Sequence, residues 1–120
     1  MNAADVSAWV DRYIRAWDTN DAAEIGGLFG ERAMYYTAPF REPWRGRDAI
    51  VAGWLDSKDE PGDHAFRYEV AGIDGDLSIV RGWTTYPEQD PPAYSNLWLI
   101  RFDPDGRARE FIEWWMAESG

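Results

Sequence analysis

The first thirty residues alternate between apolar and polar positions with a helical period. One apolar face recurs every three or four residues, at Val6, Trp9, Val10, Tyr13, Ile14 and Trp17. This spacing predicts an amphipathic helix, which Asn2 and Asp5 would cap. The Thr-Asn-Asp segment at residues 19–21 breaks the period and offers a second cap. A short second helix is expected after it, with an apolar stripe at Ile25, Leu28 and Phe29 that Gly30 would end.

The period then changes from helix to strand. Residues 33–37 are typical of a strand, prolines 39 and 43 mark an irregular crossing segment, and residues 47–56 predict a third helix. Residues 65–74 and 77–86 alternate around an Asp-Gly pair, which predicts an antiparallel hairpin. A second hairpin is predicted from residues 94–103 and 107–116, joined by Pro-Asp-Gly. This order predicts an α+β fold, with helices packed on one face of a curved antiparallel sheet.

Composition and charge narrow the classes of function. The 120 residues contain no linker or repeat, so one domain spanning residues 1–120 is expected. The net charge of −10 disfavours nucleic acid and anionic membranes as partners. The absence of cysteine excludes thiol chemistry, and His64, expected to be exposed in a polar loop, has no neighbouring ligands for a metal. Neither a signal peptide nor a membrane-spanning stretch is recognised, so a cytoplasmic protein is expected.

Tryptophan is the most unusual component of the sequence. The chain has eight tryptophans, six tyrosines and five phenylalanines, which is more aromatic area than a small core needs. Two interpretations remain open. The indoles fill a tryptophan-rich core, or they line a cavity for a small molecule, since such cavities are mostly apolar with a few placed polar groups.

Four segments carry a family resemblance: residues 11–21, Leu28-Phe29, residues 42–50 (EPWRGRDAI) and residues 106–115. They resemble the nuclear transport factor 2-like superfamily, which includes SnoaL-like polyketide cyclases, ketosteroid isomerase and limonene epoxide hydrolase. The resemblance implies a cone-shaped α+β fold, whose curved, mixed sheet wraps around N-terminal helices and encloses a cavity. It also implies a homodimer that pairs through the outer sheet face. It indicates chemistry poorly, because one scaffold hosts both enzymes and non-catalytic binders.

Strand alternation, anchored on the resemblance to ketosteroid isomerase, assigns side chains to the cavity. On the strands, the predicted ligand-binding residues are Tyr35, Thr37, Trp83, Thr85, Asn96, Trp98, Phe111 and Trp115. Trp17 and Trp54, with Tyr13, would close the helical side. The same phase turns Arg81 and Glu113 inward, where a mutual ion pair is expected, because a lone buried charge is costly. A register slip of one residue would place both outside instead.

The resemblance also suggests catalytic roles for three residues. Tyr13 corresponds to the oxyanion-hole tyrosine of ketosteroid isomerase, although a packed tyrosine with a satisfied hydroxyl is the alternative. Thr37 and Trp98 replace that enzyme's two acids, so steroid isomerisation by its route is not expected. Trp83 likewise replaces the water-activating aspartate of limonene epoxide hydrolase. SnoaL-like cyclases use an acid near the last strand, a position that Glu113 fills.

We therefore predict that Glu113, Arg81 and Tyr13 act on a small hydrophobic or aromatic molecule without a cofactor, in an isomerase, cyclase or lyase reaction. A non-catalytic ligand carrier and a structural dimerisation module remain alternatives. In an enzyme, Glu113→Gln should abolish turnover and leave ligand affinity nearly unchanged, whereas loss of binding alone would indicate a carrier. A fully packed interior would favour the dimerisation module.

Overall fold

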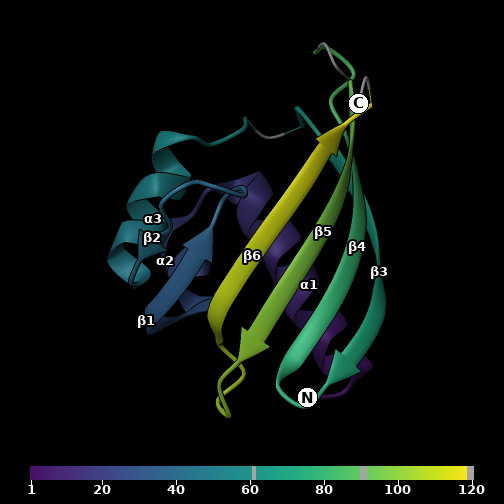
Figure 1. Cartoon of the computed structure of the whole chain (residues 1–120). Coiled ribbons are helices and arrows are strands. Elements are labelled where there is room, and N and C mark those ends of the chain that lie inside the picture. The colour runs from purple at the N-terminus through teal and green to yellow at the C-terminus, as the bar shows by residue number, and fades with distance from the viewer. Residues whose placement is uncertain (61, 90–91, 119–120) are drawn as a thin grey trace.

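The fold is an α+β arrangement of helices beside one mixed sheet (Figure 1). The computed structural model describes residues 1–60, 62–89 and 92–118. Its helices are α1 (Ala3–Thr19), α2 (Ala22–Gly27) and α3 (Arg47–Asp56). Its strands are β1 (Phe29–Tyr36), β2 (Trp44–Arg45), β3 (Ala65–Asp74), β4 (Leu77–Thr85), β5 (Ala93–Phe102) and β6 (Ala108–Ala117). The predicted fold class is confirmed.

Capping residues define both ends of helix α1. Asn2 and Asp5 form a capping box, in which each side chain accepts a hydrogen bond from the other residue's backbone N–H. Asn20 ends the helix in the left-handed conformation, with φ of 53°. The second helix is shorter than expected. Phe29 starts β1 instead, because it pairs with Ala108 of β6 and the carbonyl of Leu28 accepts the indole N–H of Trp9.

The sheet order is β2-β1-β6-β5-β4-β3, and β6 therefore lies between the first strand and the two hairpins. β1 runs parallel to β6, whereas β3, β4, β5 and β6 pair antiparallel in sequence. Gly75 and Gly106 supply the positive φ values of 60° and 86° that the two hairpin turns require. Figure 1 shows α1 lying across one face of these long strands, with the opposite face uncovered by any helix.

Aromatic side chains fill the space between α1 and the covered face, which we call the inner face. Trp9 packs against Phe29, Phe102 and Phe111 at centroid distances of 5.5–6.0 Å. Trp98 packs against Phe111 at 5.0 Å. Trp9, Trp98, Phe29 and Phe111 are all fully buried. The tryptophan-rich core and the aromatic-lined hollow therefore coexist: the middle of the cone is solid, and open space remains at one end.

The predicted phase of β4 is wrong by one residue. Ser78, Val80 and Thr84 are buried on the inner face, whereas Ile79, Arg81, Trp83 and Thr85 lie on the outer face. Val80 pairs directly with Trp98, whose side chain faces inward, so Val80 and the alternate residues of β4 face inward as well. Gly82 is inward as well, and the ring of Phe66 lies so close that an added Cβ would approach it to 2.3 Å. A glycine is therefore needed there to seat Phe66, which in turn stacks on Trp98 at 5.0 Å.

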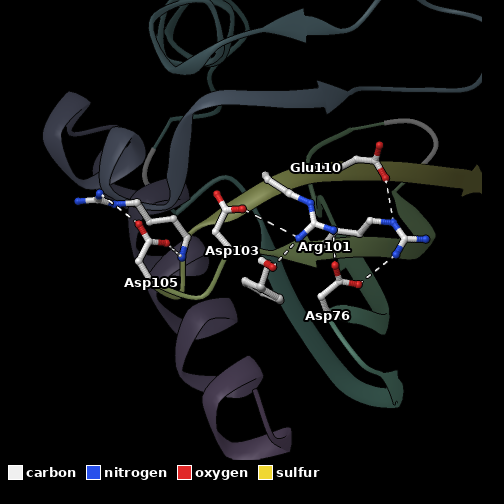
Figure 2. Close-up of polar contacts among 8 residues, drawn as sticks. Asp76, Arg101, Asp103, Asp105 and Glu110 are labelled. Carbon is white, nitrogen blue, oxygen red and sulfur yellow. Dashed lines mark hydrogen bonds and ion pairs between the residues drawn. The ribbon is translucent and has the colours of Figure 1, made fainter.

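The turn end of the sheet is held by ion pairs on its surface (Figure 2). Arg101 lies between Asp76 and Glu110, at 3.1 and 3.5 Å, and Arg109 also binds Asp76. Arg109 further donates to the carbonyl of Phe102. These groups lie at the opposite end of the strands from the open space described next, so they brace the hairpins rather than contribute to a site.

Candidate functional site

Two adjoining hollows open near the C-terminal end of β6, between the inner face, α1 and the loop that follows α3. Their volumes are about 270 and 180 Å³. They share Tyr13, Trp17, Asp59, Tyr86 and Glu113, and we refer to them together as the cleft. The larger hollow is also lined by Thr84, Gln89, Tyr94, Asn96, Trp98 and Trp115. The smaller is also lined by Tyr35, Trp44, Trp54, Ser57 and Lys58.

Glu113 is the partly buried carboxylate on the sheet side of the cleft. Its Oε2 accepts hydrogen bonds from Trp98 Nε1 at 2.9 Å and from Asn96 Nδ2 at 3.0 Å. The Thr84 hydroxyl donates to Asn96 Oδ1 at 2.8 Å, which directs the amide nitrogen toward Glu113. Burial raises the pKa of Glu113, and the two donors oppose this effect in part. Oε1 has no hydrogen-bond partner among the described residues.

Tyr13 and Tyr35 form a buried hydroxyl pair, with their oxygens 2.6 Å apart. Both rings stack on Phe111, at centroid distances of 5.4 and 4.6 Å, so this fully buried residue positions the pair. One hydroxyl proton bridges the two oxygens, which leaves the other proton free to bond to a third group. Burial raises the pKa of both phenols well above the ordinary value, so both stay protonated and act as donors.

Asp59 provides a second carboxylate that sequence analysis missed. Its Oδ2 accepts hydrogen bonds from Trp17 Nε1 at 2.8 Å and from the Tyr86 hydroxyl at 3.0 Å. Its carbonyl accepts from Asn20 Nδ2 at 2.8 Å, and Trp54 Nε1 donates to the same Asn20 side chain at 3.3 Å. Asn20, the C-terminal capping residue of α1, thus holds the loop that carries Asp59 in place. Asp59 lies in a polar loop without periodicity, so the sequence held no signal for it.

His64 is half-buried instead of exposed, which corrects the sequence expectation. Its ring stacks on Trp17 at 3.9 Å between centroids, with planes 18° apart. Its Nδ1 is buried without a hydrogen-bond partner in the described part of the chain. Burial lowers the pKa of His64, although Asp59, Asp18 and Asp63 oppose the shift. The neutral ring therefore backs the indole that positions Asp59.

Most of the predicted site residues come together at the cleft. Those that line it are Tyr13, Trp17, Tyr35, Trp54, Asn96, Trp98, Glu113 and Trp115. Phe111 lies beneath them in the core, and Thr37 is half-buried after the end of β1 without lining the cleft. The inward placement of Arg81, Trp83 and Thr85 is wrong. Arg81 pairs with Glu69 at 3.5 Å on the outer face, so the expected Arg81–Glu113 pair does not form.

Sequence reasoning also missed several aromatic lining residues. Tyr94 follows the alternation that turns Asn96 inward, so extending that pattern by one step would have found it. Thr84 and Tyr86 follow from the correct phase of β4. Trp44 comes from the irregular crossing segment, where no period applies.

Within residues 1–60, 62–89 and 92–118, no three histidine, aspartate or glutamate side chains are grouped to hold a metal ion. The helices in the same ranges are too short or too polar to traverse a bilayer.

Solved structures share this architecture. A protein from Sphaerobacter thermophilus has a TM-score of 0.70 at 20% identity, with coverage of 92% of this chain and 94% of the other. A ketosteroid isomerase-like protein from Erwinia carotovora atroseptica has a TM-score of 0.68 at 19% identity, with 96% of each chain covered. An NTF-2 like protein of unknown function from Burkholderia xenovorans has a TM-score of 0.74 at 14% identity, covering 95% and 84%. These likenesses establish the fold.

No curated protein matches the chain in sequence. The pattern of the SnoaL-like domain, however, matches residues 10–111. This range includes α1 from its middle, the whole of β1 to β5 and Phe111 at the base of the cleft. Because the match extends over well more than half of its length, the chain belongs to the SnoaL-like family.

Proposed function

We propose that the cleft binds a small ring-containing molecule and that Glu113 moves a proton on it as a general base, without a cofactor. The observation that carries this proposal is the Glu113 carboxylate itself. It is held on one oxygen by two neutral donors, it shares a hollow with the Tyr13–Tyr35 pair, and burial raises its pKa. A raised carboxyl pKa brings the base closer to the operating pH, which favours proton abstraction.

The chemistry follows from what each group donates or accepts. Glu113 takes a proton from the carbon next to a ligand carbonyl, and the C–H electron pair shifts to form an enolate. The carbonyl oxygen gains the charge and accepts the spare hydroxyl proton of the tyrosine pair as a hydrogen bond. If the enolate is conjugated with a C=C bond, return of the proton from Glu113 to the far end of that bond gives an isomerisation. Attack of the enolate carbon on a second carbonyl of the same molecule forms a C–C bond and an alkoxide, and return of the proton from Glu113 to this alkoxide completes a cyclisation. Neither outcome requires an oxidant or reductant.

The cleft favours a small substrate. The hollows of about 270 and 180 Å³ each lie below the range of about 300–1,000 Å³ that is typical of ligand pockets, and together they fall in its lower part. Five of the eight tryptophans line these walls. A compound of one or two rings suits this space better than a steroid. The ketosteroid isomerase-like name of one structural neighbour supports the reaction class only as far as the shared fold does.

The experiment follows α-proton exchange in D₂O by ¹H NMR, using a panel of one-ring and two-ring ketones. This assay detects the first step even when the product is unknown. Wild-type protein is expected to accelerate exchange, and Glu113→Gln to lower the rate by about 100-fold or more. Glu110→Gln is the matched control, since Glu110 lies on the outer face of the same strand. Binding of the ketones without exchange would make the protein a carrier and overturn the catalytic proposal.

We further propose that the chain forms a homodimer through the outer face. Ile79, Leu99 and Ile112 are paired across β4, β5 and β6 on that face, and Leu97 is paired with Trp114, which is 54% exposed. Contiguous exposed apolar area of this kind is typical of an interaction surface. Trp114→Glu should shift the sedimentation coefficient from dimer to monomer, whereas a wild-type monomer at high micromolar concentration would contradict the proposal.

A further inference from the structure

The cleft has an imbalance of charge that the proton-transfer proposal does not use. Among the described residues, Asp59 and Glu113 are the charged side chains that line the larger hollow, and both are acidic. Lys58 lines only the smaller hollow, and its side chain forms no ion pair in the described structure. Two carboxylates therefore line one space, one from the loop after α3 and one from β6.

Neutral groups hold both carboxylates. An indole and a phenol donate to Asp59, and an indole and an amide donate to Glu113. These bonds fix the position of each carboxylate without cancelling its charge. In both residues the two donors converge on one oxygen, and the second oxygen has no partner in the described parts of the chain. The cleft thus offers a fixed, uncompensated acceptor on each side.

Acidic groups elsewhere on the sheet are treated differently. Glu69 pairs with Arg81, Glu110 pairs with Arg101, and Asp76 pairs with both Arg101 and Arg109. Arginine is the usual counterion in this chain, which has eleven arginines and one lysine. The larger hollow is lined by none of them. A bound cation would supply the counter-charge that the residues lining the larger hollow lack.

Most of the other residues that line the larger hollow are aromatic. The aromatic ones are Tyr13, Trp17, Tyr86, Tyr94, Trp98 and Trp115. Tyr94 meets Tyr86 and Trp115 edge to face, at centroid distances of 5.8 and 5.9 Å and interplanar angles of 90° and 82°. Rings at right angles present their faces in different directions around the opening. Aromatic faces attract organic cations through the ring quadrupole, and ammonium groups are bound in cages of this composition.

We propose that the ligand carries a positive charge, as an ammonium group attached to the ring compound, and that this group binds between Asp59, Glu113 and the aromatic walls. This inference rests on the proposed function and specifies its substrate class. The cationic end occupies the larger hollow, and the carbonyl end reaches the Tyr13–Tyr35 pair in the smaller one. Neutral ring compounds of the same size should bind more weakly.

The bound cation would also act on the base. A positive charge beside Glu113 favours its ionised form, which opposes the effect of burial on its pKa. The bound ligand would thus help to keep Glu113 deprotonated, which is the form of a general base that accepts a proton.

The test compares benzylammonium with benzyl alcohol, which have the same ring and the same number of heavy atoms. Binding is followed at pH 7 by tryptophan fluorescence and by calorimetry. Benzylammonium is expected to bind at least about tenfold more tightly, as one close charge pair at partly exposed sites permits. Equal or tighter binding of benzyl alcohol would overturn the charge preference and leave the ring-binding function in place. Failure of benzylammonium to bind at ~10 mM would also overturn it, and the ketone exchange assay then judges the proposed function separately.

Two pairs of variants locate the effect. Asp59→Asn keeps an oxygen for Trp17 and Tyr86 but removes the charge, so benzylammonium should bind about three- to tenfold more weakly while benzyl alcohol is unaffected. Asp56→Asn removes the same charge from the exposed end of α3, outside the cleft, and should change neither. Trp115 is 46% exposed, so Trp115→Leu should fold and lose about threefold in cation binding, and Trp115→Phe should retain more of it. If Asp56→Asn weakened binding as much as Asp59→Asn, the charge effect would be general and the site assignment wrong.

Discussion

The two faces of the sheet stabilise their acidic side chains with different partners. On the outer face, Glu69 and Glu110 are paired with arginines and remain in contact with water. On the inner face, Glu113 is held by an indole and an amide, in surroundings that raise its pKa. The exposed ion pairs of the outer face are expected to contribute little to the free energy of unfolding. The inner arrangement is unfavourable for the ionised group, and such an arrangement persists where a ligand or a reaction uses it.

The two faces also differ in how tightly they are packed. The largest effect of a substitution is expected at Gly82, on the inner face of β4. An added methyl group would lie 2.3 Å from Phe66, so Gly82→Ala should lower the free energy of unfolding by about 2–3 kcal/mol, as overpacked sites do. Arg81→Ala, one residue away on the outer face, should cost about 0.5 kcal/mol or less. Urea denaturation followed by fluorescence measures both. Similar losses would mean that the two faces of β4 are not distinct.

Glu113→Gln tests the inner carboxylate through pH. Because folding raises the pKa of Glu113, its stabilising contribution is complete below the ordinary glutamate pKa and is lost as pH rises through the folded value. The amide oxygen of the introduced glutamine can accept the same two hydrogen bonds without ionising. The variant should therefore be more stable than wild type at pH 7, and this advantage should disappear as pH falls below the ordinary glutamate pKa. Thermal unfolding between pH 3 and 8 gives the difference, and a constant offset would contradict the raised pKa.

The hydroxyl pair tests the inner face at a second position. Tyr35→Phe removes one oxygen and leaves Tyr13 without its buried partner, so the free energy of unfolding should fall by about 1 kcal/mol. Tyr36→Phe, the half-buried neighbour on the other side of β1, is the control and should change stability little. The same denaturation assay applies. An unaffected Tyr35→Phe protein would indicate that the tyrosine hydroxyls do not depend on each other.

The smallest effect is expected from the outer ion pair. Arg81 and Glu69 have side chains that are 57% and 55% exposed. A double-mutant cycle with Arg81→Ala and Glu69→Ala should give a coupling energy of about 0.2–0.5 kcal/mol, which 1 M salt removes. A coupling that resists salt would show that the outer pair is sheltered, for example by a partner subunit.

Periodicity in the sequence was sufficient for much of the fold. It predicted α3 with the observed bounds and both hairpins to within about a residue at each end, because helix period, strand alternation and the glycine turns agree with one another locally. The phase of β4 was not predictable in the same way. Ile79 and Trp83 are apolar, as inward residues usually are, but the outer face of this sheet also carries apolar side chains between its ion pairs. The pairing of Val80 with Trp98 decides which β4 side chains face inward. This pairing belongs to the tertiary structure and cannot be inferred from the alternation of β4 alone.

The candidate site divides along similar lines. Glu113, Asn96 and Trp98 could be assigned from alternation on β5 and β6, and Tyr13 and Trp17 from the helical period of α1. Asp59 could not, because no regular element places it. Its position depends on the left-handed Asn20, which binds the loop from a residue 39 positions earlier in the chain. Contacts of this kind leave no repeating signal in a sequence.

The central position of β6 has a consequence for biosynthesis. The strand that carries Glu113 is synthesised after both β1 and β5, yet it lies between them in the sheet. Until it emerges, a nascent chain exposes two unpaired strand edges instead of one continuous sheet, and such edges invite association with other chains. Correct folding therefore depends on rapid capture of β6 between these two edges, and slow translation of that segment would favour aggregation over assembly.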